Sequence, residues 1–169
     1  KNRGAESRFT LNHAPIGDWA GVWGLQLSNT DFSAIGEEAF VPKSEIEAQG
    51  LFGVERFTRG NLTGELGLRL ERNRIDAGGV CDFNETSNSF SGSLLYDVTT
   101  QSNLLFSVAR SQRAPSVEEL YSNVATTDCM RFADNEQLVL HAATNLLEVG
   151  NPSLDKETSQ NIEFGFRRH

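Results

Sequence analysis

The chain has 169 residues, of which 38% are hydrophobic, and it carries a formal net charge of -8 with a sequence pI near 4.9. This length predicts a single domain with one core. No run approaches the ~18 consecutive apolar residues of a membrane-spanning helix, so a helical membrane protein is excluded. The acidic balance argues against the phosphate-binding surface of a nucleic-acid-binding protein, and we expect no nucleic-acid partner.

Seven segments of the chain alternate apolar and polar residues, which is the period of a β-strand with one dry and one wet face. They span residues 5–13, 19–29, 46–57, 62–71, 88–98, 103–110 and 161–167. The fourth is the clearest, with Leu68 and Leu70 on one side and Arg69 and Glu71 on the other. In the third segment, the alternation predicts that Phe52 lies on the apolar side.

The connections between these segments alternate in length. Short turns at 15–18, 58–61 and 99–102 alternate with longer loops at 29–45, 75–86 and 111–160. An antiparallel up-and-down meander would place the short turns at one end and the loops at the other, as in an outer-membrane barrel. The apolar face would then contact lipid, and the polar face would line a wet interior. A soluble β-sandwich stays open as an alternative, because it also needs one dry face.

The last loop begins and ends with local turn signals. Pro115 ends the preceding strand, because it has no N–H and disfavours a helical conformation at Ala114. Ser116 and Glu119 have the spacing of a capping box, which predicts a short helical turn over 116–121. Asn151-Pro152 marks a second turn before the last strand.

Three blocks of this region resemble the TonB-dependent outer-membrane receptors. They are residues 112–121 (QRAPSVEELY), 150–158 (GNPSLDKET) and 161–165 (NIEFG), in the order in which such receptors have them. The residues that carry the resemblance are Arg113, Ala114, Pro115, Glu119, Leu120, Tyr121, Asn151, Pro152, Leu154, Glu157, Glu163 and Gly165. Residues 36–42 and 66–71 are similar to a proteobacterial branch that includes zinc-uptake receptors.

The resemblance implies an all-β fold that is a fragment of a 22-stranded transmembrane barrel. Residues 1–169 would be a partial barrel domain, without the plug domain, the TonB-contacting box or the early strands. We expect a bacterial outer-membrane location, contact with lipid, and coupling to TonB through the missing plug. The fragment alone should not transport. Its free edges predict an open, curled sheet or an edge-paired oligomer, with the apolar side turned inward.

The resemblance also implies a ligand class, which is a metal ion or metal chelate of the zinc, siderophore or haem type. His141 lies in a segment similar to the His-containing loop of the zinc-receptor branch, and Glu37 and Glu38 lie in a loop on the same side. Imidazole and carboxylate groups suit zinc. A single histidine in a polar loop is more often only solvated. No resident cofactor is expected; zinc or an iron chelate would be cargo.

Cys81 and Cys129 are 48 positions apart and have no metal-finger spacing, so spacing alone leaves a disulfide and two free thiols open. Because outer-membrane proteins fold through an oxidising periplasm, the resemblance favours a disulfide between them. Glu118, Glu119 and Tyr121 could be taken for catalytic groups, but the helical turn explains them better. We expect Arg113 to form a buried ion pair with carboxylates of the barrel.

No catalytic motif is present, so we expect no enzyme. His13 falls at a strand end and His169 at the terminus. Two classes of function remain at this stage. One is part of a receptor for metal or metal-chelate uptake, and the other is a soluble recognition or adhesion module whose long loops bind a partner.

Overall fold

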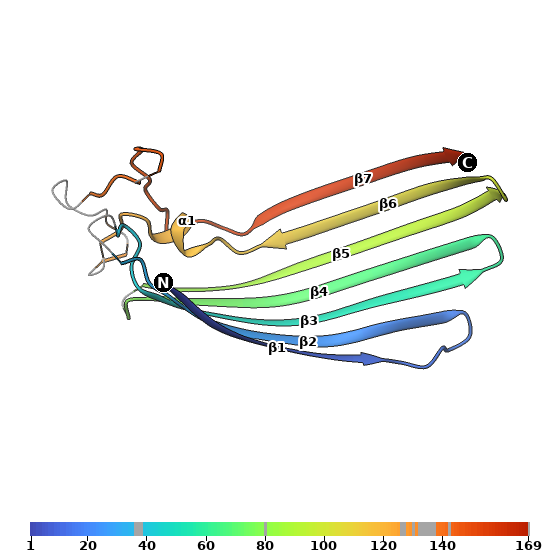
Figure 1. Ribbon diagram of the computed structural model, residues 1–169, viewed down its shortest axis with the longest axis horizontal. Helices are drawn as coiled ribbons and strands as arrows, with labels where there is room; N and C mark the ends of the chain where they lie inside the picture. Colours follow the sequence, from blue (N-terminus) through green and yellow to red (C-terminus); the bar gives the residue numbers. More distant parts are fainter. Residues whose placement is uncertain are drawn as a thin grey trace.

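The computed structural model describes residues 1–35, 39–79, 81–125, 128–129, 131, 138–141 and 143–168. These residues form one antiparallel sheet whose seven strands lie side by side in sequence order (Figure 1). The strands are β1 (Asn2–Asn12), β2 (Trp19–Phe32), β3 (Ser44–Arg59), β4 (Leu62–Ala77), β5 (Cys81–Thr99), β6 (Ser102–Arg113) and β7 (Glu157–Arg168). A short helix, α1 (Val117–Tyr121), follows β6.

The all-β, up-and-down fold expected from the sequence is confirmed. The alternative fold, a β-sandwich of two packed sheets, is wrong for the described strands. In a sandwich a second sheet would cover the apolar face, whereas the described strands form a single sheet. Leu66, Leu68 and Phe90 on that face stay about half exposed, at 52%, 47% and 48%. None of the described helical residues forms a segment long and apolar enough to cross a membrane.

Cross-strand register shows which side chains share a face, because paired residues point the same way. Leu25 pairs with Leu51, and Leu51 pairs with Leu70. Two residues closer to the short turns, the same alignment joins Trp23, Gly53, Leu68 and Phe90. We call the face that carries these residues the apolar face, and the opposite one the polar face.

The prediction for the third strand is wrong. Phe52 is aligned with Gly24 of β2 and Arg69 of β4, which places it on the polar face. Its ring is only 8% exposed and lies beneath the guanidinium group of Arg8, 4.5 Å from the ring centroid. Gly24 makes room for the ring, because a Cβ there would come within 2.3 Å of Phe52 Cζ. The aromatic ring is therefore packed by a glycine and a cation rather than exposed to lipid.

The border between apolar and polar side chains crosses the sheet obliquely. On the apolar face, the first polar residue towards the loops is Asn29 on β2 and Gln160 on β7. Cross-strand pairing aligns Asn29 with Arg74 of β4. It aligns Gln160 with Leu68 of β4, which is six residues closer to the short turns than Arg74. With about 3.3 Å per residue and about 4.8 Å per strand, this shift corresponds to a strand tilt on the order of 40°, as in outer-membrane barrels.

The strands are longer than the sequence suggested, and one loop prediction is wrong. Residues 75–86 were expected to form a loop, but β4 continues to Ala77 and β5 begins at Cys81. The tight connection contains Gly78 and Gly79 with φ of 70° and 73°, which glycine adopts without steric cost. A membrane strand needs only about 9–11 residues, whereas β4 has 16 and β5 has 19. These strands are therefore longer than a membrane crossing requires, and they continue to the end of the sheet where the long loops lie (Figure 1).

Each edge strand, β1 and β7, pairs on one side only, and its outer edge has no strand partner among the described residues, so the sheet is open as expected. The expectation that the apolar face turns inward is wrong. Ile162 and Phe164 of β7 are 77% and 72% exposed. A hollow on the polar face is lined from Arg8 of β1 to Ser111 of β6, so the sheet curves towards its polar side. The curvature is thus that of a barrel wall with its apolar face outward.

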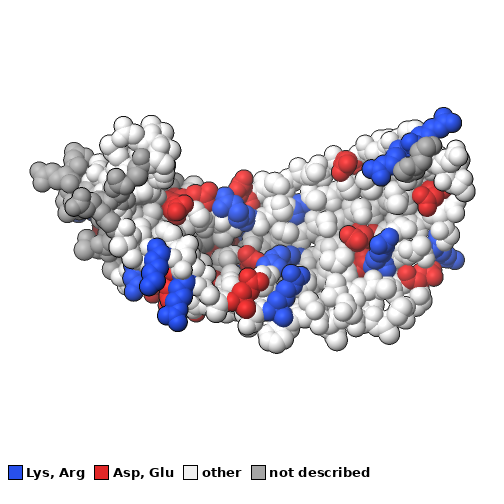
Figure 2. Space-filling view, in the orientation of Figure 1, with Lys and Arg blue, Asp and Glu red and all other residues white. Residues whose placement is uncertain are grey.

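Charged side chains are mixed in sign along the molecule. Figure 2 shows basic and acidic groups interspersed among other residues on the face in view, with no continuous basic surface there. On the polar face, the Arg69 guanidinium donates to Glu71 Oε2 at 2.8 Å and to Gln26 Oε1 at 3.1 Å. On the apolar face near the short turns, Glu55 accepts from the Trp23 indole at 2.7 Å and lies 3.0 Å from His13 Nε2. The Glu55 carboxylate therefore has two hydrogen-bond partners on this face.

Candidate functional site

The main hydrophobic cluster lies on the polar face at the loop end. Its buried members are Val41, Ile75, Ala77, Cys81, Val117, Leu120 and Tyr121. Ile75 and Ala77 have the same parity as Glu71 on β4, so the wet face becomes apolar where α1 covers it. Leu120 is 0% exposed and Tyr121 is 2% exposed, as expected for the residues that pack the helical turn down. This packing folds the start of the last loop over the inner side of the sheet.

The helical turn expected over 116–121 is confirmed. Ser116 is the N-cap of α1; its hydroxyl accepts from the Glu119 N–H at 3.2 Å, and Glu119 Oε2 accepts from the Ser116 N–H at 2.7 Å. This reciprocal capping box satisfies two N–H groups that would otherwise lack partners at the start of the helix. Pro115 is buried, and β6 ends before it as predicted, although the strand continues to Arg113, three residues beyond the predicted end at 110.

Arg113 ties three elements together. Its guanidinium donates to both carboxylate oxygens of Glu119, each at 2.9 Å, and to Glu157 Oε2 at 2.8 Å. Arg113 ends β6, Glu119 lies in α1 and Glu157 begins β7, so the two ends of the loop are joined. The expectation that this ion pair is buried is wrong, since the three side chains are 55%, 43% and 66% exposed. Both ion pairs lie at the loop root, where the described residues leave the three side chains partly exposed to solvent.

The guanidinium also determines the ionisation of Glu119. Its hydrogen bonds to the carboxylate, followed by the bond from the Ser116 N–H, lower the pKa of Glu119 to about 2. Glu119 is thus ionised at neutral pH. An ion pair and a helix cap share one carboxylate.

The returning end of the loop crosses the backbone of α1. The Gly150 N–H donates to the Ser122 carbonyl at 2.7 Å, and the Asn151 N–H donates to the Glu119 carbonyl at 2.8 Å. A Cβ at Gly150 would lie 2.5 Å from the Leu120 backbone, so this crossing requires glycine. The turn expected at Asn151-Pro152 begins directly after it.

Asn123 holds the middle of the loop and was missed in the sequence. It is 4% exposed, has φ of 53°, and its amide group donates to the Val139 and Glu148 carbonyls at 2.9 and 2.7 Å. Its Oδ1 accepts from the Val139 N–H at 2.9 Å. Asparagine tolerates a left-handed backbone better than most residues. The only signal in the sequence was an asparagine just after a predicted helical turn.

Three further motif residues have structural positions. The Leu154 N–H donates to the Asn151 carbonyl at 3.2 Å. Glu163 pairs with Ser107, so it lies on the polar face of β7. Gly165 is aligned with Leu105, whose Cβ would be 3.5 Å from a Cβ at that position. None of these contacts brings a reactive group to the loop cluster.

The structure joins Cys81 and Cys129 in a disulfide, with a Cα–Cα distance of 5.5 Å. Cys81 is the first residue of β5 and is 2% exposed, whereas Cys129 belongs to the last loop. The bond closes 48 residues of chain between the wall and the loop. The loop is thereby attached to the sheet at a point distant from Arg113 in sequence.

The proposed metal ligands are placed only in part. His141 is half-buried; its ring lies edge-on to Phe40, 5.4 Å between centroids, and its Nδ1 is 3.2 Å from the Thr144 hydroxyl. Glu37 and Glu38 lie outside the described residues. Among the residues that the structure describes, no group of three or more metal-ligating side chains is assembled. The contact with Phe40 nevertheless joins the two loops that carry the predicted ligands.

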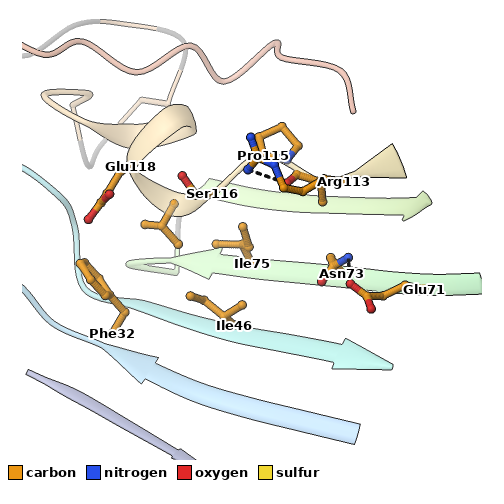
Figure 3. Close-up of a pocket in the computed structure, with 11 residues that line it drawn as sticks. Phe32, Ile46, Glu71, Asn73, Ile75, Arg113, Pro115, Ser116 and Glu118 are labelled. Carbon is orange, nitrogen blue, oxygen red and sulfur yellow. Dashed lines mark hydrogen bonds between the residues drawn. The ribbon is translucent and has the colours of Figure 1, made fainter. Parts of the chain in front are cut away.

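A cavity of about 380 Å³ opens between α1 and the polar face (Figure 3). Its floor is apolar, with Phe32 and Ile46, and its rim carries Arg113, Glu118 and Glu71. The complete lining is Phe32, Ile46, Glu71, Asn73, Ile75, Arg113, Ala114, Pro115, Ser116, Val117 and Glu118. Such a combination of apolar surface and few charged groups is typical of small-molecule sites. The described loop end can therefore enclose a ligand, but it contains no arrangement for covalent chemistry.

A comparison with protein-family models extends over the entire chain. The model described as "TonB dependent receptor-like, beta-barrel" matches residues 1–169. The match includes all seven strands and the loop cluster.

Proposed function

Because the chain belongs to the TonB-dependent receptor-like β-barrel family, we propose that it forms part of the wall of a receptor that imports a metal ion or a metal chelate. Members of the family are transport receptors of the bacterial outer membrane and act with TonB. The proposal adds the ligand class, in which zinc, a siderophore complex and haem are the candidates, and coupling to TonB through a plug domain.

The loop end supports this proposal more than any other part of the molecule. The contact of His141 with Phe40 brings together the loop at 33–43 and the loop at 114–156, which carry the candidate metal ligands. Both loops lie at the end of the sheet opposite the short turns, where an outer-membrane receptor faces the outside. The cavity beside α1 provides space on the inner side of the wall. A ligand captured by the loops would thus enter on the wet face.

Uptake by the full-length receptor tests the ligand class. The receptor is expressed in a bacterium that lacks its own uptake routes for zinc, ferric siderophores and haem, and each labelled ligand is supplied in turn. We expect accumulation of one of them only when TonB is present. If none accumulates while the receptor is folded in the outer membrane, the ligand class is wrong.

Zinc has a sharper test. In calorimetry with the purified full-length receptor, His141→Ala should weaken zinc binding by about tenfold or more, because a neutral imidazole is a preferred zinc ligand. His13→Gln, at the opposite end of the sheet, is the matched control and should bind zinc as the wild type does. Equal zinc affinity in all three proteins would eliminate His141 as a ligand.

A further inference from the structure

The apolar face is the outward face of the curved sheet, and we call its apolar side chains the apolar belt. On the loop side of this belt lies a line of polar residues that we call the boundary line. It consists of the first polar residue on each of five neighbouring strands: Gln49, Arg72, Asn88, Arg110 and Gln160. Two of the five are arginines and none is a carboxylate. This line follows the oblique border that gives the strand tilt, so it lies at one level of the membrane.

Negative charge on this face is concentrated further from the belt. Glu47 lies beyond Gln49 and is aligned with Arg74 of β4. The next row contains four carboxylates, Asp31, Glu45, Asp76 and Asp82, and Arg3 of β1 is aligned with Asp31 at its edge. Next to the apolar side chains, the outward face therefore carries Arg72 and Arg110, neither of which is aligned with a carboxylate, and the carboxylates of this end lie further out.

The two arginines of the boundary line are held in place without being neutralised. Arg72 Nε donates to Asn84 Oδ1 at 3.0 Å, and an Arg110 terminal nitrogen donates to Asn88 Oδ1 at 2.7 Å. Within the described part of the chain, neither arginine forms an ion pair, whereas Arg69 and Arg113 on the polar face both do. The amide oxygens orient each guanidinium and leave its other N–H donors available.

We propose that Arg72 and Arg110 bind the phosphate groups of lipid headgroups in the outer leaflet, with Asn84 and Asn88 as positioning residues. A planar guanidinium forms strong paired hydrogen bonds with phosphate, and arginine is weakly hydrated compared with lysine. The site is continuous with the apolar belt that contacts the acyl chains, so a lipid bound there would contact the protein along its whole length. The inference rests on the barrel's orientation in the membrane and not on the identity of the transported ligand.

The experiment uses the full-length receptor purified in detergent and two probes, lipid A with its two phosphates and the same lipid after dephosphorylation. Bound lipid is counted by native mass spectrometry. We expect the phosphorylated lipid to bind the wild type more tightly, and the combined variant Arg72→Gln/Arg110→Gln to lose about tenfold or more of this affinity. Arg59→Gln is the matched control, because Arg59 is an exposed arginine of β3 at the opposite, short-turn end.

Two outcomes would overturn the proposal. One is equal binding of both probes by the wild type, a comparison that needs no variant and so does not depend on the folding of one. The other is unchanged binding by the double variant when its heat-modifiable gel migration shows a folded barrel. Because lipid binding is measured without any transported ligand, failure of metal uptake would leave this result unaffected.

Discussion

The ion pair at the loop root predicts a measurable local stability. Glu119→Gln removes the charge that binds Arg113 but keeps a side-chain oxygen that can accept from the Ser116 N–H, so the capping box remains. Glu118→Gln is the matched control, because Glu118 is the exposed neighbouring carboxylate and forms no ion pair within the described residues. The difference between the two variants isolates the ion pair.

The expected size follows from the pKa of Glu119, which falls from 4.5 to about 2. Taken in full, such a shift would correspond to roughly 3 kcal/mol. Because the Glu119 side chain is 43% exposed, solvent screening reduces the contribution to about 1 kcal/mol. This value corresponds to about a fivefold change in the equilibrium between closed and open forms of the turn.

Hydrogen exchange followed by mass spectrometry measures this opening in a peptide that spans 114–124. The Leu120 N–H donates to the Ser116 carbonyl and the Ser122 N–H to the Glu118 carbonyl, so both report on α1. We expect about fivefold faster exchange in Glu119→Gln and no change in Glu118→Gln, after correction for intrinsic rates.

The pH dependence of this contribution to stability follows from the direction of the pKa shift. The pKa of Glu119 is lowered in the folded state, so its contribution is fully present above the unfolded value near 4.5 and is lost as the pH falls towards 2. The advantage of the wild type over Glu119→Gln should therefore disappear between these values. Equal exchange in Glu119→Gln and Glu118→Gln at neutral pH would refute the assigned role of the ion pair.

The remaining predictions concern the disulfide, the polar face and the edges. Alkylation of the denatured, unreduced receptor should add no label at Cys81 or Cys129, and two labels would contradict the bond. Gly24→Ala should destabilise the barrel by about 1–3 kcal/mol in urea unfolding, because its Cβ would overlap Phe52, whereas Gly92→Ala, with its nearest atom at 3.5 Å, should have little effect. The 169-residue chain refolded alone in detergent should sediment as an oligomer through its free edges, and a monomer would argue against edge pairing.

The assignment of strand faces succeeded where one side of a strand was clearly apolar and failed where both sides were mixed. On β4, Leu68 and Leu70 against Arg69 left no ambiguity. On β3 both sides carry apolar residues, and Phe52 was favoured over Leu51. Register decides between them, since Leu51 lies between Leu25 and Leu70. A single strand holds no information about its neighbours, so this error could not be corrected from its own residues.

The loop expected at 75–86 shows a second limit of sequence interpretation. Asp76, Asn84 and the Gly78-Gly79 pair are typical of loops. In the structure Gly78 and Gly79 lie in the connection, and the residues on either side of it, up to Ala77 and from Cys81, pair across β4 and β5. Polar residues are compatible with strands where neither face needs lipid. The polar composition correctly indicated contact with water, but it wrongly predicted a loop where the backbone forms strands.

At the candidate site, the features that could be predicted were local and those that were missed were distant in sequence. The capping box of Ser116 and Glu119 was predictable because its partners are three residues apart. The bond from Arg113 to Glu157 spans 44 residues, and that from Asn123 to Glu148 spans 25. Such partners become visible only when the sheet and α1 bring them together.

One face of β4 has different roles along its length, and this explains how the loop is supported. Arg69 and Glu71 face the wet interior in the middle of the wall, while Ile75 and Ala77, on the same side, form the base on which α1 packs. The ion pair of Arg113, the disulfide and the crossing at Gly150 attach the same loop at three further points. His141 therefore projects from a loop whose described root is fixed to the wall, and a ligand bound there would act on a preorganised frame rather than order a free chain.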